Sequence, residues 1–120
     1  QWAAVAAFAE AKTLVPQIRS AMQARRDTFV SIFKEKFSFD LPTPACGLYS
    51  FFPMSALRMS GTGDDVAFCT QVLEQGNVAM VPCTPFGTPA YVRCSFGAPE
   101  NELKESVNAL HTFIQTLSTS

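Results

Sequence analysis

The sequence predicts one small α/β domain of the α+β kind, in which a three-stranded sheet packs on helices in two layers. Three observations carry this prediction. Apolar residues near the C-terminus recur with a helical period. Apolar and polar residues alternate around Arg93, as in a half-buried strand. The length of 120 residues allows one domain with a modest core. The expected order of elements is α-α-β-α-β-β-α.

Two helices are expected in the first third of the chain. Residues 2–14 are alanine-rich and apolar, which favours a helix. A second helix is expected over residues 17–37, because its apolar residues recur on one face. Pro16 between them either breaks and restarts the helix or kinks one long helix. The expected core face of the second helix is Ile18, Met22, Phe29, Phe33 and Phe37.

The middle of the chain is divided by prolines and glycines. Pro42 and Pro44 end the helical region, and the aromatic run 48–52 then reads as a strand that Pro53 stops. Residues 60–63 (SGTG) are expected to form a flexible loop.

A third helix is expected after this loop. Asp64 or Asp65 caps its N-terminus and Gly76 ends it. Its expected core face is Val66, Cys69, Val72 and Leu73.

Two strands and a helix complete the expected domain. Residues 78–81 form a short apolar run that reads as a buried strand. A proline-rich loop over 82–89 leads to a strand over 91–96. The last helix begins near Pro99, with acidic residues in its first turn. Its apolar stripe is Leu103, Val107, Leu110, Ile114 and Leu117.

Composition excludes several classes of function. The net charge is −1 with no basic run, so we expect no nucleic-acid partner. No apolar stretch reaches the roughly 20 residues of a membrane span. The four cysteines are widely spaced and there is one histidine, so we expect no metal site, and reduced, buried thiols in a cytoplasmic protein. The 11 phenylalanines either fill the core, or some of them lie on a surface that another domain or subunit covers.

Arg93 is the most informative polar residue, because it lies in the middle of an apolar strand. By alternation it shares a face with Tyr91 and Ser95, whereas Val92 and Cys94 point the other way. A guanidinium group pairs bidentately with a carboxylate, so a carboxylate ligand is one candidate partner. The alternatives are a structural ion pair with an internal Asp or Glu, or an edge strand that leaves the arginine in water.

Other chemical candidates have simpler explanations. Ser31 and Lys34 match a Ser-x-x-Lys pattern, but they lie on an amphipathic helix and read as a solvated face. His111 is one step off the apolar stripe of the last helix and reads as a partly exposed side chain. The glycines are too sparse for a phosphate-binding loop.

An ordered set of segments resembles one enzyme family. Residues 91–97 (YVRCSFG), 78–87 (VAMVPCTPFG) and 44–51 (PACGLYSF) are similar to motifs of class I and II aminotransferases, as is the Arg25-Arg26-Asp27 turn. The segments follow the order of the family and span nearly the whole chain. Two residues depart from the motif of the 82–89 loop, where Cys83 replaces a glycine and Pro85 replaces a small residue, which leaves the shape of the loop in question.

The resemblance implies a pyridoxal-phosphate enzyme of fold type I that transfers an amino group between an amino acid and a 2-oxo acid. Residues 1–120 would be its C-terminal small domain, a fragment without the large domain that binds the cofactor. Arg93 would bind the α-carboxylate of the substrate, and loop 82–89 would lie near the active site. No catalytic or cofactor-binding residue is expected in this chain.

Further expectations follow from the resemblance. The whole enzyme would be a homodimer, and aspartate is the favoured substrate type. Two alternatives stay open: a non-enzymatic module that binds a carboxylate ligand or a partner protein, and a related pyridoxal-phosphate enzyme with a different reaction.

Overall fold

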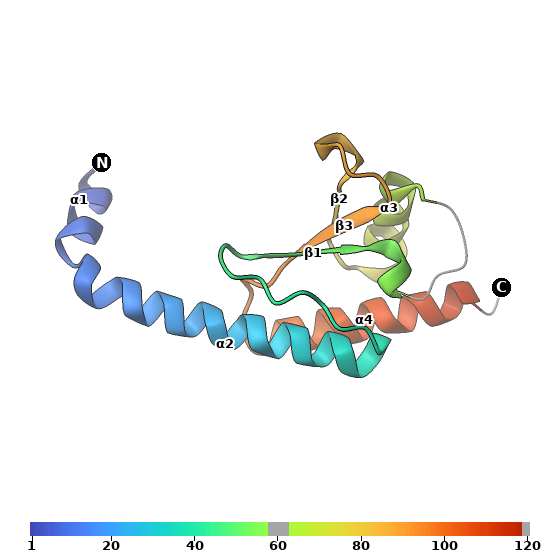
Figure 1. Ribbon diagram of the computed structural model, residues 1–120, viewed down its shortest axis with the longest axis horizontal. Helices are drawn as coiled ribbons and strands as arrows, with labels where there is room; N and C mark the ends of the chain where they lie inside the picture. The colour runs from blue at the N-terminus through green and yellow to red at the C-terminus, as the bar shows by residue number, and fades with distance from the viewer. Residues whose placement is uncertain (58–62, 119–120) are drawn as a thin grey trace.

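The computed structural model describes residues 1–57 and 63–118, and it has the expected order of elements (Figure 1). The predicted 60–63 loop lies outside the described residues except for Gly63. The helices are α1 (Trp2–Ala9), α2 (Ala11–Phe37), α3 (Asp65–Gly76) and α4 (Glu100–Ser118), with 3-10 turns η1 (Met54–Leu57) and η2 (Thr84–Phe86). The strands are β1 (Tyr49–Pro53), β2 (Val81–Pro82) and β3 (Tyr91–Ser95).

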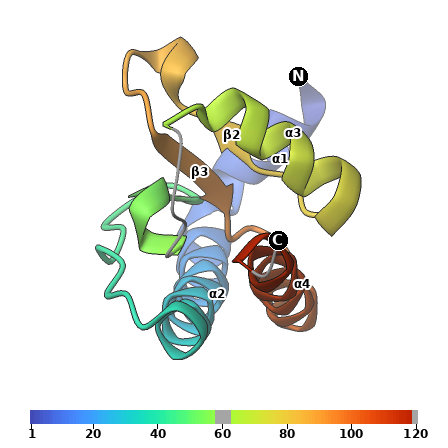
Figure 2. The ribbon, with the colours of Figure 1, turned by 90° about the vertical axis from the view of Figure 1, so that its right-hand side faces the viewer.

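The three strands form one antiparallel sheet in the order β1-β3-β2. Arg93 lies at its centre, because it pairs with Phe51 of β1 on one side and Val81 of β2 on the other. Helices α2 and α4 lie side by side below the sheet (Figures 1 and 2), and α3 packs against β2, β3 and α4. The predicted α+β class and two-layer arrangement are therefore confirmed.

The core lies between the sheet and the helices, where apolar burial stabilises the domain. Phe33 of α2 contacts Phe52 of β1, with ring centroids 4.8 Å apart. Helix α4 buries the predicted stripe except for Leu117, which is partly exposed near the helix end. Seven of the 11 phenylalanines are buried, whereas Phe8, Phe51 and Phe86 are exposed. Core filling therefore accounts for most of the phenylalanines, and three others lie on the surface of this chain.

The N-terminal helices differ from the prediction. The break between α1 and α2 lies at Glu10, and Pro16 lies inside α2. The prediction of a break at Pro16 was wrong, because this stretch is exposed and water can bind the Lys12 carbonyl that the proline ring leaves free. Ile18 is also exposed rather than in the core, since α1 and the first turns of α2 project beyond the rest of the domain (Figure 1).

Helix α3 buries only part of the face predicted for it, since Cys69 and Val72 are buried as expected. Val66 and Leu73 are exposed, and the buried residues are Asp65, Phe68, Cys69 and Val72. The spacing of apolar residues did not reveal this rotation, because a buried aspartate occupies the first position of the true inner face.

Helix α3 ends at Gly76 as predicted, but the glycine does not supply the left-handed conformation expected of it. Gly76 is the last helical residue, and Asn77 takes the left-handed conformation with φ of 53°. The glycine serves packing instead, since a Cβ there would lie 3.3 Å from the Phe113 side chain.

The strand predicted over 78–81 is shorter than expected. Only Val81 and Pro82 pair with β3, whereas Val78–Met80 form no ladder. Met80 is still buried, so the apolar run reports burial and not strand pairing. Among residues 1–57 and 63–118, no helix combines the length and the apolar character needed to cross a bilayer.

Candidate functional site

Strand β3 has an inner face and an outer face. Val92 and Cys94 are buried against the helices, as is Phe96 just beyond the strand, whereas Tyr91 and Arg93 lie on the opposite, outer face. The alternation predicted from the sequence is confirmed. The outer face also carries Tyr49 and Phe51 of β1, both exposed.

The Arg93 guanidinium lies between two aromatic rings. Its Cζ atom is 4.5 Å from the ring centroid of Tyr49 and 5.0 Å from that of Phe86. A cation over an aromatic face gains about 0.5–2 kcal/mol, depending on desolvation. The two rings therefore hold the guanidinium from a strand on one side and from η2 on the other.

The polar atoms of Arg93 are not matched by a protein carboxylate. Its Nε is buried and has no hydrogen-bond partner. Within residues 1–57 and 63–118, no Asp or Glu forms an ion pair with Arg93. The structural ion pair that the sequence left open is thus not found in this part of the chain, and the edge-strand alternative is wrong because β3 is the central strand.

A buried carboxylate holds the loop that carries Phe86. Asp65 Oδ2 accepts hydrogen bonds from the backbone N–H groups of Cys83 and Thr84, both at 2.6 Å. Its Oδ1 accepts a hydrogen bond from Thr84 Oγ1 at 2.5 Å. Asp64, not Asp65, caps α3, because its Oδ1 accepts from the Ala67 N–H at 2.9 Å.

The hydrogen bonds decide the ionisation of Asp65. Burial alone raises the pKa of this carboxyl group, but the hydrogen bonds from Thr84 and from the Cys83 backbone together outweigh it and leave the pKa below its usual value. Asp65 is therefore an anion that accepts three hydrogen bonds.

The two departures from the family loop motif fit this geometry. Cys83 has φ of −105°, a conformation that does not require glycine, and its N–H donates to Asp65. Pro85 lies in the first turn of η2, where the missing N–H has no helical partner to lose. Replacing the glycine and the small residue therefore leaves a well-formed turn.

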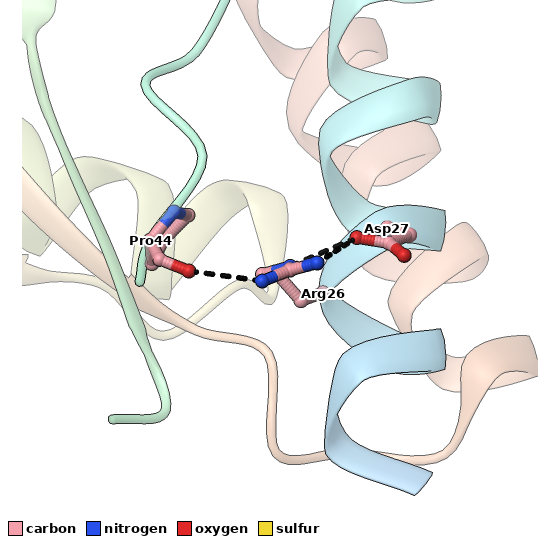
Figure 3. Close-up of polar contacts among 3 residues, drawn as sticks. All are labelled: Arg26, Asp27 and Pro44. Carbon is pink, nitrogen blue, oxygen red and sulfur yellow. Dashed lines mark hydrogen bonds and ion pairs between the residues drawn. The ribbon is translucent and has the colours of Figure 1, made fainter. Parts of the chain in front are cut away.

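Two arginines of α2 tie the sheet to the helix. Arg26 donates to the Pro44 carbonyl at 3.2 Å and pairs with Asp27 at 2.7 Å (Figure 3). Arg25 donates to the Gly97 carbonyl at 2.5 Å. These contacts join the segments before β1 and after β3 to one helix, so the Arg-Arg-Asp turn helps to position the strand that carries Arg93 and the strand that carries Tyr49.

The remaining candidates lie away from the outer face. Lys34 forms an exposed ion pair with Asp40 at 2.6 Å, as expected for a solvated face. His111 is half-buried with its ring edge on Phe37. Cys69, Cys83 and Cys94 are buried free thiols, but Cys46 is exposed, which corrects the expectation that all four are buried. Cys46 lies in the loop before β1, where its side chain is exposed, and not on a strand or helix that packs in the core.

Comparisons with known proteins identify the family of the chain. The family model of class I and II aminotransferases matches residues 1–110, and the chain belongs to this family. It is 32% identical over 117 residues to an asparagine–oxo-acid transaminase of Streptococcus mutans, and 32% identical over 116 residues to an aspartate aminotransferase of Streptomyces avermitilis. These matches cover 96% and 92% of this chain but only 30% and 28% of the relatives.

Solved structures give the same result. The crystal structure of an aspartate aminotransferase from Thermotoga maritima matches 80% of this chain with a TM-score of 0.68 and 29% identity, and 24% of that protein is covered. An aromatic aminotransferase from Pyrococcus horikoshii matches 88% of this chain and 28% of its own length, with a TM-score of 0.74. At 20% identity, the second match shows the fold alone.

The sequence identified Arg93 but not the groups around it. Tyr49, Phe86 and Asp65 have no distinctive spacing, since they come from β1, η2 and α3. One available signal was the adjacent pair Asp64-Asp65, because a helix needs only one capping side chain and the second aspartate was left unexplained.

Proposed function

We propose that this chain is the C-terminal small domain of a pyridoxal-phosphate-dependent aminotransferase, and that Arg93 binds the α-carboxylate of the substrate. Membership in the family and the resemblance to its motifs support this proposal. The chain spans about 30% of the length of its relatives, so the remaining parts of the active site would come from other segments of the whole protein. We further propose a cytoplasmic homodimer that acts on aspartate or a similar amino acid.

The observation that carries the proposal is the environment of Arg93. A guanidinium group is costly to bury without a counter-ion, and no carboxylate in the described part of the chain supplies one. A substrate carboxylate would provide that counter-ion and bind bidentately. The partner would thus arrive with the substrate, and this accounts for an arginine held between two rings in the middle of a sheet.

The cofactor would be held by other parts of the protein. When bound, pyridoxal phosphate supplies the electron sink for amino-group transfer. The four lysines of this chain are all on α2 and α4 and none is on the sheet: Lys12, Lys34, Lys36 and Lys104. Arg93, in contrast, is on the outer face of the sheet. This placement fits the substrate carboxylate and not the cofactor, so the role of the chain would be to bind and orient the substrate.

Substitution of Arg93 in the whole protein tests this function. Arg93→Ala should lower kcat/KM. The loss of transition-state stabilisation that this fall reports should be about 2–5 kcal/mol, the usual cost of removing one partner of a buried charge pair. Arg93→Lys should recover only part of this, because an ammonium group lacks the bidentate fork. Steady-state kinetics with L-aspartate and 2-oxoglutarate measure both effects.

Folding provides the control for this experiment. Arg93→Ala should lower the free energy of unfolding by about 2 kcal/mol or less, since it loses the contacts with the two aromatic rings but no ion pair within the described residues. An Arg93→Ala protein with normal kcat/KM would refute the proposed function.

A further inference from the structure

We propose that Asp65 is a positioning residue for the Arg93 site, because it holds η2 and thereby places the Phe86 ring against the guanidinium. This inference rests on the proposed function, in which Arg93 binds the carboxylate of the substrate. The hydrogen bonds of the Asp65 side chain join it to Cys83 and Thr84 and not to Arg93, so its effect would pass through the 3-10 turn.

Asp65 holds the start of the turn rigidly. Its side chain is only 1% exposed. Its three hydrogen bonds all go to two consecutive residues, Cys83 and Thr84, at 2.5–2.6 Å. Hydrogen bonds to a charged acceptor are short and strong. A carboxylate buried in this way fixes both the position and the orientation of the backbone where η2 begins.

The turn transmits this placement to Phe86. The N–H of Phe86 donates to the Cys83 carbonyl at 2.9 Å, and the N–H groups of Thr88 and Gly87 donate to the carbonyls of Cys83 and Thr84 at 3.1 and 3.0 Å. Because η2 has only three residues, its orientation follows from that of the two residues that Asp65 holds.

Phe86 has little else to keep it in place. Its side chain is 63% exposed, so burial in the core does not fix it. Its ring nevertheless lies 5.0 Å from Arg93 Cζ. The opposite ring, Tyr49, is on β1 and is held by strand pairing with β3. The start of the η2 loop is also tied to β3, because the Cys83 N–H is shared with the Tyr91 carbonyl at 3.1 Å. One wall of the Arg93 site is thus held by the sheet, and the other is held by Asp65 together with this one backbone hydrogen bond.

Three single substitutions in the whole protein test this inference. Asp65→Ala removes all three hydrogen bonds. Asp65→Asn keeps an oxygen for the two backbone N–H groups, and its amide can donate to the Thr84 hydroxyl, so it should preserve the turn. Asp64→Ala is the matched control, because it removes the neighbouring cap of α3 and destabilises the helix without touching η2.

We expect Asp65→Ala to raise KM for L-aspartate about tenfold with kcat changed less than about twofold, as for loss of binding that is equal in ground and transition states. Asp65→Asn and Asp64→Ala should keep KM within about twofold of the wild type. A second readout needs no turnover: the rate at which phenylglyoxal modifies Arg93, followed by mass spectrometry, should rise about threefold in Asp65→Ala only, as the Phe86 ring moves away.

Phe86→Leu covers the case in which Asp65→Ala does not fold. This side chain is mostly exposed, so the substitution should leave folding intact. Because it removes the ring that Asp65 places, it should raise KM at least as much as Asp65→Ala does, about tenfold. An unchanged KM in Phe86→Leu, or an equal rise of KM in Asp65→Ala and Asp64→Ala, would overturn the inference. Normal kinetics of Arg93→Ala would instead overturn the proposed function, so the two failures are distinguishable.

Discussion

The two faces of the small sheet use the same strands for different purposes. On the inner face, Phe52 and Val92 are fully buried against the helices, and residues there contribute to stability by apolar burial. On the outer face, Tyr49 and Phe51 are exposed, and Arg93 lies among aromatic rings without a carboxylate partner from residues 1–57 and 63–118. Successive side chains of a strand point to opposite faces of the sheet. Neighbouring residues of one strand therefore have different roles, one in the core and the next on the outer face.

Thiol labelling should give the largest contrast, because Cys94 lies on the inner face. Burial raises the pKa of Cys94 to about 12. At pH 8 its thiolate population would be at least about a thousandfold below that of an ordinary thiol, whose pKa is about 8.5. Cys46 is exposed and should react with a thiol reagent such as Ellman's reagent within minutes.

Cys69 and Cys83 should behave like Cys94. Both are buried, and burial raises the pKa of Cys69 to about 11 and also raises that of Cys83. One fast thiol is therefore expected in the folded chain and four after denaturation. Rapid native labelling of Cys94 would show that the inner face opens readily.

Adjacent phenylalanines separate the two faces in terms of stability. Phe52→Ala should destabilise the chain by about 3–5 kcal/mol, as expected for a fully buried aromatic residue. Phe51→Ala should cost about 1 kcal/mol or less, because Phe51 is 45% exposed and mainly stacks on Tyr91. Chemical denaturation of both variants measures the difference, and equal losses would mean that the outer face is also part of the core.

A smaller effect should appear in the pH dependence that Asp65 contributes. Its pKa in the folded chain is lower than its ordinary value of 3.8, so the folded state favours the ionised form. The stabilisation by Asp65 is fully present above that ordinary value and is lost as the pH falls through the lower pKa of the folded state. Asp65→Asn should remove this component.

Urea denaturation of the wild type and of Asp65→Asn at pH 6 and pH 3 measures this dependence. The difference in free energy of unfolding between the two proteins should favour the wild type more at pH 6 than at pH 3. A difference that is the same at both values would mean that the ionisation of Asp65 is not coupled to folding.

Local patterns predicted the elements of the fold well, and the site only in part. The stripe from Leu103 to Ile114 and the alternation through Val92 and Arg93 were both confirmed, because each follows from the repeat of a single element. The inner face of α3 was predicted only in part, and the extent of β2 was not predicted. Both depend on which neighbours an element meets, and periodicity carries no information about neighbours.

The sequence by itself determined that the chain has an α+β fold, that Arg93 faces away from the core, and that its motifs belong to the aminotransferase family. Only the tertiary structure decided what surrounds Arg93. Tyr49, Phe86 and Asp65 lie far apart in the sequence, and pairing of β1 with β3 and the docking of α3 beside β2 bring them to one place. A rotation of α3 about its own axis would have moved Asp65 away from the loop, and no local pattern excludes that rotation.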